Sequence, residues 1–402
     1  MNRIIRRLTL VMALATLAAG CVSQSIKTTS IPAVDTPSQS IADSELLDVS
    51  IAIFDPGLDS EIDDDSPVFT EVRQAEARYI PQLLMGSLQN SGAWGAVRVV
   101  PTDDQLTDLM ISGKIVHSDG KTLTLEIDAV DATGHSWLDS KQYSAEASRY
   151  AYATTTRVTH DAFQAVYNRI ANDLLAHFQT LSSNQRERVR SVAEMRFAER
   201  FASEAFVDYV VFRDGRYQLQ KLPADNDPML ERVRVIRTRD QLYVDTLQTY
   251  YEQFGVQMQA PYQEWRKLTY EEAIALEQIK AESRKELIIG GAAVLAGIYA
   301  SANGNDAVTR TAGNVAIMGG GYMVKSGLDK RNEAAIHVEA LEELGASLEA
   351  EMTPQIIELN DQTITLTGSV QDQYAQWRAL LDDIYRTEVG DLPTNTGPTD
   401  TP

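Results

Sequence analysis

A glycine-rich, mostly apolar stretch at residues 287–327 constrains the fold of this chain more than any other feature. It reads LIIGGAAVLAGIYASANGNDAVTRTAGNVAIMGGGYMVKSG and has a turn composition at residues 303–306. Its glycines are placed symmetrically about Asn305: Gly297 with Gly313, Gly291 with Gly319, and Gly290 with Gly320. Because glycine has no Cβ, two helices can pack almost backbone to backbone along such rows. The sequence therefore predicts an antiparallel helical hairpin over residues 263–351.

The same stretch admits a second interpretation, insertion into a membrane. As a helix, residues 287–302 would be roughly 24 Å long, whereas the hydrocarbon core of a bilayer is about 30 Å thick. The second arm also contains Thr309, Arg310 and Asn314. We expect the hairpin to pack in water, against itself or a second copy. Membrane insertion or pore formation through residues 287–327 is the alternative.

The N-terminus has the pattern of an export signal. Three arginines within residues 1–7 precede an apolar run that is too short to span a membrane. The run ends in Ala-Ala-Gly-Cys at residues 18–21, which resembles a bacterial lipobox. That resemblance implies a signal peptide at residues 1–20 and lipidation of Cys21, the single cysteine of the chain. The alternative is an ordinary signal peptide followed by a chance cysteine.

Lipidation would fix the location of the protein. Several acyl chains anchor a protein stably, since each buried methylene contributes about 0.8 kcal/mol. Residue 22 is valine, not the aspartate often found in lipoproteins kept at the inner membrane. By this resemblance we expect an outer-membrane lipoprotein on the periplasmic face of a Gram-negative envelope.

Composition and spacing divide the rest of the chain. Residues 21–44 are rich in Ser, Thr and Pro and predict a flexible tether of roughly 25–30 Å. Pro261 is expected to end one helix before another begins at Tyr270. The remaining units are an α/β domain at 45–182, a helical region with a β-hairpin at 183–262, the helical hairpin at 263–351, a small β-hairpin plus helix at 352–388, and a disordered tail at 389–402.

The 45–182 segment alternates between strand and helix patterns. An alternating strand near residues 46–55 precedes an amphipathic helix at 71–90. Four more strands and a helix at 159–181 follow. The expected order is β-α-β-β-β-β-α, which gives one sheet with helices on a face and an α+β fold class overall.

This segment resembles the small α/β domain of several bacterial envelope proteins. They include the N-terminal domain of the Tol–Pal translocation protein TolB and the curli-secretion lipoprotein. The shared elements are a helix ending in Gly92-Ala93-Trp94, a strand, a polar stretch, and then the sequence DLMISG at 108–113. The resemblance implies an envelope-associated role, but we find no segments suited to the transmembrane strands of a curli-type pore.

Few chemical motifs are present. The five histidines lack a second ligand at metal-binding spacing, and the acidic run at 59–65 lacks the EF-hand pattern, so we expect no metal and no cofactor. Phosphate-loop, dinucleotide-binding and nucleophile-elbow motifs are missing. The formal net charge of −21 disfavours nucleic acid as a partner. We expect no catalytic residue and no enzyme activity; a periplasmic hydrolase is a further alternative.

Aromatic residues cluster around Pro261. Tyr250, Tyr251, Tyr262 and Trp265 are a candidate partner surface, with core packing against the α/β domain as the alternative. Together these features predict a lipid-anchored structural or accessory protein of an envelope complex. Its expected partners are outer-membrane lipid through Cys21, unidentified envelope proteins, and a second copy of itself.

Overall fold

The computed structural model describes residues 31–58, 70–152, 160–224, 226–301, 343, 355–359 and 362–389. The α/β domain begins with the short helix η1 and has the predicted order β-α-β-β-β-β-α. Its elements are η1 (Asp43–Glu45), β1 (Val49–Ala52), α2 (Thr70–Ser91), β2 (Val97–Val100), β3 (Leu109–Ser118), β4 (Thr122–Asp131), β5 (Ser136–Glu146), η2 (Arg149–Tyr152) and α3 (Gln164–Thr180).

Helices and two small hairpins follow, and the α+β class is confirmed. The later elements are α4 (Ser183–Phe201), α5 (Ser203–Phe206), β6 (Val210–Arg213), β7 (Arg216–Leu219), α6 (Pro228–Ser301), β8 (Gln355–Leu359), β9 (Gln362–Leu366) and α8 (Val370–Val389). The predicted turn between β6 and β7 is present, with positive φ at both Asp214 and Gly215. The predicted C-terminal hairpin and helix are β8, β9 and α8.

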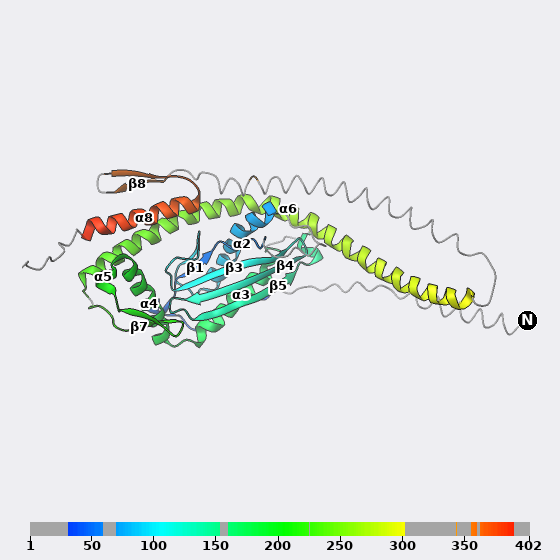
Figure 1. Ribbon diagram of the computed structural model, residues 1–402, viewed down its shortest axis with the longest axis horizontal. Coiled ribbons are helices and arrows are strands. Elements are labelled where there is room, and N and C mark those ends of the chain that lie inside the picture. Colours follow the sequence, from blue (N-terminus) through cyan, green and yellow to red (C-terminus); the bar gives the residue numbers. More distant parts are fainter. Residues whose placement is uncertain are drawn as a thin grey trace, which may run out of the picture.

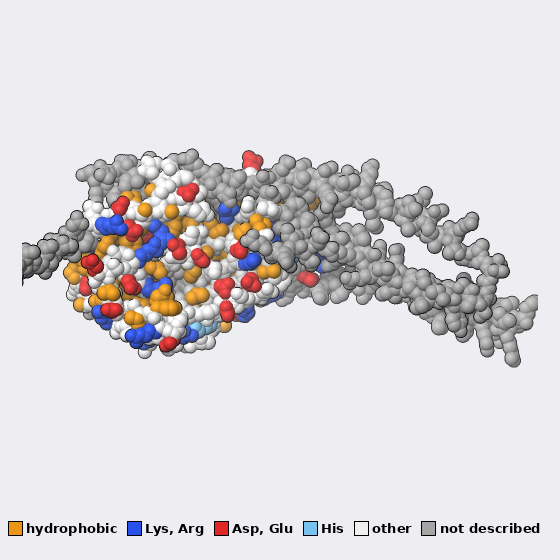
Figure 2. Space-filling model, viewed as in Figure 1, with side chains coloured by type: hydrophobic (Ala, Val, Ile, Leu, Met, Phe, Trp, Pro, Cys, Tyr) orange, Lys and Arg blue, Asp and Glu red, His pale blue; other side chains and the backbone are white. Residues whose placement is uncertain are grey.

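The sheet has five strands in the order β2-β1-β3-β4-β5. Strand β1 is parallel to β2 and β3, and the remaining pairs are antiparallel. Alternate residues of β4 from Leu123 to Ala129 are buried, because this side of the sheet packs against α2 and α3. The sheet and these two helices form the layered body seen beneath α6 in Figure 1. On the side of the body shown in Figure 2, acidic, basic and apolar side chains are interspersed.

Helix α6 seals the β2 edge of the sheet. The side chain of Gln248 makes the hydrogen bonds that a neighbouring strand would make. Its Oε1 accepts a hydrogen bond from the backbone N–H of Val99 at 2.9 Å, and its Nε2 donates to the carbonyl of Val99 at 2.8 Å. Arg98 beside it donates to Asp245 at 2.5 Å. An edge strand that is covered in this way cannot pair with another chain.

The prediction that Pro261 ends a helix was wrong. Helix α6 runs without interruption from Pro228 to Ser301 through Pro261, and therefore crosses the expected boundary between residues 262 and 263. Proline removes a backbone hydrogen bond and usually kinks or ends a helix. Here the turns on both sides are fixed by buried Met258 and Tyr262, so tertiary packing overrides the local preference.

The expectation of a flexible tether as far as residue 44 was also wrong. The carbonyls of Pro32 and Ala33 accept hydrogen bonds from Asn168 and Asn172 of α3, and Asp35 N donates to Asn172. Residues that sequence composition assigns to a linker are thus bound to the body from Pro32 onward, largely through their backbone.

The predicted glycine hairpin falls largely outside the described residues. The backbone of its first arm lies within α6 as far as Ser301, with Gly290, Gly291 and Gly297 on it. Gly313, Gly319 and Gly320 lie outside the described residues, as does the tail from residue 390.

Candidate functional site: the seat of helix α6

The first part of α6 is attached to the α/β domain through a buried polar cluster. We call this cluster the α6 seat and define it as Glu76 of α2, Ser118 of β3, Asp161 before α3, and Tyr262 and Arg266 of α6. Glu76, Tyr262 and Arg266 are each 0% exposed. Buried charges of this kind are costly unless they are paired and hydrogen-bonded, so the pairing decides what the seat does.

Arg266 is the centre of the seat. Its Nη1 donates to both carboxylate oxygens of Asp161, at 3.0 and 2.9 Å. Its guanidinium lies 3.9 Å from the ring centroid of Tyr262 and 4.5 Å from that of Phe163. Burial by itself would lower the pKa of Arg266, but Asp161 and the surrounding phenol oxygens raise it above its ordinary value. The arginine is therefore held as a cation between α6 and the segment that leads into α3.

A second branch of the seat reaches α2 and β3. Arg266 donates to the phenol oxygen of Tyr262, and this phenol donates to Glu76. Ser118 donates to the same carboxylate oxygen at 2.5 Å. The seat thus connects α6 to three separate elements of the α/β domain, a geometry that fixes the direction in which the helix leaves the body.

Gly120 places the turn between β3 and β4 directly against α6. A Cβ at this position would lie 1.8 Å from the carbonyl oxygen of Arg266 and 2.3 Å from the backbone nitrogen of Tyr270. Tyr152 donates to the carbonyl of Gly120 at 2.7 Å. Since the opposing atoms belong to the backbone, a side chain could be accommodated only if α6 moved.

Substitution of Gly120 should therefore weaken the seat. We expect Gly120→Ala to lower the free energy of unfolding by about 1–3 kcal/mol through overpacking. Gly86→Ala is the matched control, because no atom lies within 4 Å of a Cβ at that helical position. Its higher helix propensity should raise stability by up to about 1 kcal/mol. Urea denaturation of both variants tests this, and equal effects would contradict it.

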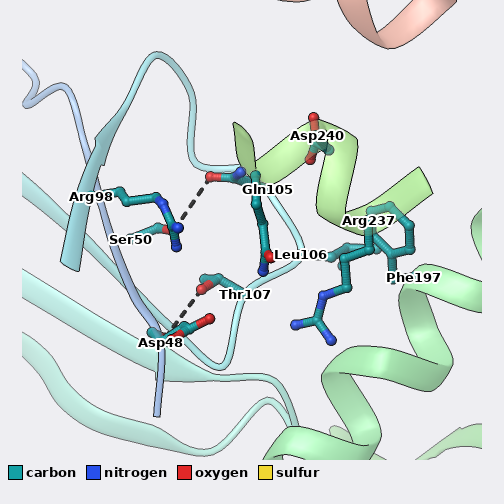
Figure 3. Close-up of a pocket in the computed structure, with 10 residues that line it drawn as sticks. Asp48, Ser50, Arg98, Gln105, Leu106, Thr107, Phe197, Arg237 and Asp240 are labelled. Atoms are coloured by element: carbon teal, nitrogen blue, oxygen red, sulfur yellow. Dashed lines mark hydrogen bonds between the residues drawn. The ribbon is translucent and has the colours of Figure 1, made fainter. Parts of the chain in front are cut away.

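A small polar pocket lies near the start of α6 (Figure 3). It holds about 20 Å³ and lies between the sheet, the loop after β2, and helices α4 and α6. In Figure 3 Arg98, Ser50 and Gln105 lie on one side, and Arg237 extends toward Asp48 and Thr107. A cavity of this size and polarity has room for about one water molecule. It is too small to hold an organic substrate.

Asp240 borders this pocket and carries a shifted pKa. The residue is 7% exposed, and burial raises its pKa to about 6. Hydrogen bonding to Trp377 and Gln105 and the charges of Arg237 and Arg98 oppose this rise. Its Oδ1 has no hydrogen-bond partner among the described residues. Ionised Asp240 is therefore a source of instability in the folded protein.

The stability of the protein should depend on pH through Asp240. A carboxyl group whose pKa is raised by folding favours the folded state at low pH, and this advantage is lost as pH rises from about 4 to about 6. Relative to Asp240→Asn, the wild-type protein should lose roughly 1–3 kcal/mol of unfolding free energy over that range. Denaturation of both proteins at several pH values measures the difference; parallel profiles would contradict the assignment.

Helix α8 packs on α6 beside this pocket. Trp377 stacks on Tyr243 with ring centroids 4.8 Å apart, and Tyr374 stacks on the same ring at 6.4 Å. Arg378 donates to Asp104 at 2.6 Å. Leu381 is fully buried on the same face of α8. The C-terminal helix is thus held by one buried face, which includes the aromatic stack on α6 and a ring contact between Tyr385 and Phe201 of α4.

The proposed aromatic partner surface is instead part of the core. Tyr251, Tyr262 and Trp265 are between 0 and 2% exposed, and Tyr250 is half-buried against the main cluster. These residues are therefore core residues, as the alternative interpretation held. Because Pro261 does not interrupt α6, the side chains of Tyr262 and Trp265 pack against α2. The acidic run at 59–65 and Cys21 lie outside the described residues.

The structure also brings together two histidines that sequence spacing does not connect. The rings of His135 and His177 lie 5.5 Å apart, and Trp137 stacks on His177 at 4.6 Å. Burial, and next the nearby His135, lower the pKa of His177. Among the described residues no group of three or more potential metal ligands occurs. In the same residues no helix combines the length and apolarity needed to cross a bilayer.

Comparisons with known proteins give little further information. No protein-family model and no curated protein matches the chain. Among solved structures, the chain is similar to protein XCC0632 from Xanthomonas campestris, described under the family name DUF330, at 12% identity. The match covers 39% of this chain and 95% of that one, with a TM-score of 0.22. That score is too low to support an argument about fold or function.

Proposed function

We propose that this protein is a lipid-anchored, periplasmic structural protein of a bacterial envelope complex, which acts by presenting a stiff helical arm to other proteins. The observation that carries the proposal is the continuity of α6. Its residues 228–270 lie on the body, and it continues as one helix to Ser301, about 45 Å beyond Tyr270. Figure 1 shows this part of α6 extending away from the sheet.

The α6 seat would fix the angle at which such an arm leaves the body. Arg266, about one helical turn before Tyr270, pairs with Asp161. The turn between β3 and β4 contacts the backbone of α6 through Gly120. A partner that binds the far part of α6 would therefore meet a helix whose base is fixed in angle. Pre-organisation of this kind lowers the entropic cost of binding.

Chain length supports the glycine hairpin as part of this arm. Helix α8 packs beside Tyr243 of α6. Ser301, the last residue of α6, lies about 87 Å beyond Tyr243 along the helix axis. Residues 302–354 would cover about 80 Å as a helix. An antiparallel return with Gly297 opposite Gly313 fits this length. The glycine rows would equally allow a second copy to pack there.

Site-specific photo-crosslinking in cells tests the docking role. A photoreactive residue at Gln278 or Tyr299 of α6 should give specific higher-mass adducts in the envelope. The same residue at Thr124, on the opposite side of the sheet from α2 and α3, is the matched control and should not give them. Adducts from Thr124 alone, or from neither arm position, would refute the arm as the docking element.

Solubility separates this proposal from membrane insertion. The protein without residues 1–20 and with Cys21→Ser should stay soluble without detergent if the glycine arms pack in water. In the same background, Gly297→Cys with Gly313→Cys should form an intrachain disulfide, since close helices bring Cα atoms within about 4.4–6.8 Å. Gly297→Cys with Gly320→Cys is the offset control. A requirement for detergent would favour the pore-forming alternative.

A further inference from the structure

The N-terminal segment is bound to one particular face of the body. Asn168 donates to the carbonyl of Pro32 at 2.8 Å, and Asn172 donates to that of Ala33 at 2.9 Å. Asn168 also accepts a hydrogen bond from Ser87 of α2 at 2.9 Å. Pro32 therefore lies where α2 and α3 meet, on the helical side of the sheet. We call this side the α2–α3 face.

The attachment shortens the connection to the lipid anchor. From Cys21 to Pro32 the chain makes eleven steps, which reach at most about 36–40 Å when fully extended. A coil of that length spans about 18 Å on average. A lipid anchor at Cys21 would therefore keep Pro32 within about 36–40 Å of the membrane surface, a shorter limit than a free tether up to residue 44 would set.

The α2–α3 face lacks the strong negative charge of the chain as a whole, so lipid phosphates would not repel it. Helix α2 contains Glu71 and Glu76 together with Arg73 and Arg78, and α3 contains Asp173 together with Arg169. Asp173 is paired with Lys141 at 2.8 Å. With Lys141 and Asp35 added, the face carries no net charge, whereas the whole chain carries −21.

The opposite face of the sheet carries more carboxylates than bases, although Lys114 of β3 lies opposite Glu126 on it. Glu126 and Asp128 of β4 alternate with buried Leu125 and Ile127, so they point away from α2 and α3. Glu146 of β5 follows buried Ala145 in the same way. Carboxylates on this side would be repelled by lipid phosphates. Tether length and charge thus favour the same orientation independently.

We propose that the α2–α3 face is the side of the protein that faces the membrane, with the carboxylate-bearing sheet face directed into the periplasm. The inference rests on the lipid anchor of the proposed function. It assigns a lipid surface as the partner of a face that would otherwise have no assigned role, and it sets the plane from which the α6 arm departs.

Energy transfer to the membrane measures the orientation. The acylated full-length protein is placed in phosphatidylethanolamine–phosphatidylglycerol vesicles that contain a head-group-labelled acceptor lipid. Once Cys21 is acylated, a single introduced cysteine carries the donor. Positions Gln89→Cys and Gln179→Cys on the α2–α3 face are compared with Val130→Cys and Gln142→Cys on the sheet face. All four are exposed side chains.

We expect at least twofold higher transfer efficiency from the two helical positions than from the two sheet positions. Insertion of twelve Gly and Ser residues after Ser25 should reduce that difference, because a longer tether relaxes the constraint. Equal or reversed efficiencies with Cys21 shown by mass spectrometry to be acylated would overturn the orientation alone. Unmodified Cys21 would overturn the lipid anchor and the orientation with it.

Discussion

Asp161→Ala should lower the free energy of unfolding by about 3–5 kcal/mol, the cost of leaving a buried charge without its partner. Arg266 is fully buried, and the side chain of Asp161 is 5% exposed. The substitution removes both of the acceptors that Nη1 uses and leaves the guanidinium between aromatic rings. For a chain of this size the midpoint of thermal unfolding should fall by roughly 6–15 °C.

The double variant Asp161→Leu/Arg266→Met isolates the electrostatic part of this loss. It removes both charges at similar volume, and buried ion pairs replaced in this way are often neutral or stabilising. We therefore expect it to be more stable than Asp161→Ala. Glu194→Ala is the surface control, because its partner Arg234 is 43% exposed and such pairs contribute about 0–1 kcal/mol.

Hydrogen exchange on the same variants locates the effect. If the seat holds the base of the arm, Asp161→Ala should speed exchange in α6 around residues 258–270 more than in the sheet. An unfolding free energy within about 1 kcal/mol of the wild-type value would show that Arg266 finds other partners. In that case the seat would not be what fixes the direction of α6.

The sequence predicted the α/β domain well because its signals are local. Strand alternation, the positive-φ pair Asp214-Gly215, and the spacing of buried residues in α3 are each determined within a few residues. The order of five strands and two helices could be read from them. The position of β2 beside β1 depends on pairing over longer distances and did not follow from spacing alone.

The seat could not be predicted because its members are far apart in sequence. Glu76, Asp161 and Arg266 come from three segments, and no short motif joins an arginine to acids about 100 to 190 residues away. The same cause explains the error at Pro261. Local propensity favours a helix end there, whereas contacts with α2 keep the helix intact. His135 and His177 likewise meet only after β5 and α3 have packed.

The tether prediction for the N-terminal segment was wrong for a different reason. Residues 31–44 have a linker composition, and composition reports how little apolar surface a segment can bury. It does not report backbone carbonyls that side chains of a folded neighbour can bind, as Asn168 and Asn172 do here. Sequence composition therefore placed the start of the folded body too far along the chain.

Trp377→Ala should detach α8 from α6. The indole is 5% exposed and stacks on Tyr243, so its loss should cost about 3–5 kcal/mol of packing. Leu381 and Ile384, the other apolar side chains on this face, are too far along α8 to fill the space left by the indole. Exchange of the α8 amides should therefore become at least about 100-fold faster, since 1.4 kcal/mol corresponds to a factor of ten.

The control variant for Trp377→Ala also lies in α8, and exchange of the α8 amides distinguishes the outcomes. Arg378→Ala removes the ion pair with Asp104, whose side chain is 57% exposed, and a cation–ring contact with Tyr374 at 5.7 Å. It should change α8 exchange by less than tenfold. If Trp377→Ala instead leaves α8 protected, the ring stack is not what holds the helix. If it destabilises the sheet as much as α8, the C-terminal helix belongs to one cooperative unit with the α/β domain. Faster exchange confined to α8 would show that the C-terminal helix docks on α6 as a separate unit. It could then detach from α6 while the contacts of Arg266 in the seat remain intact.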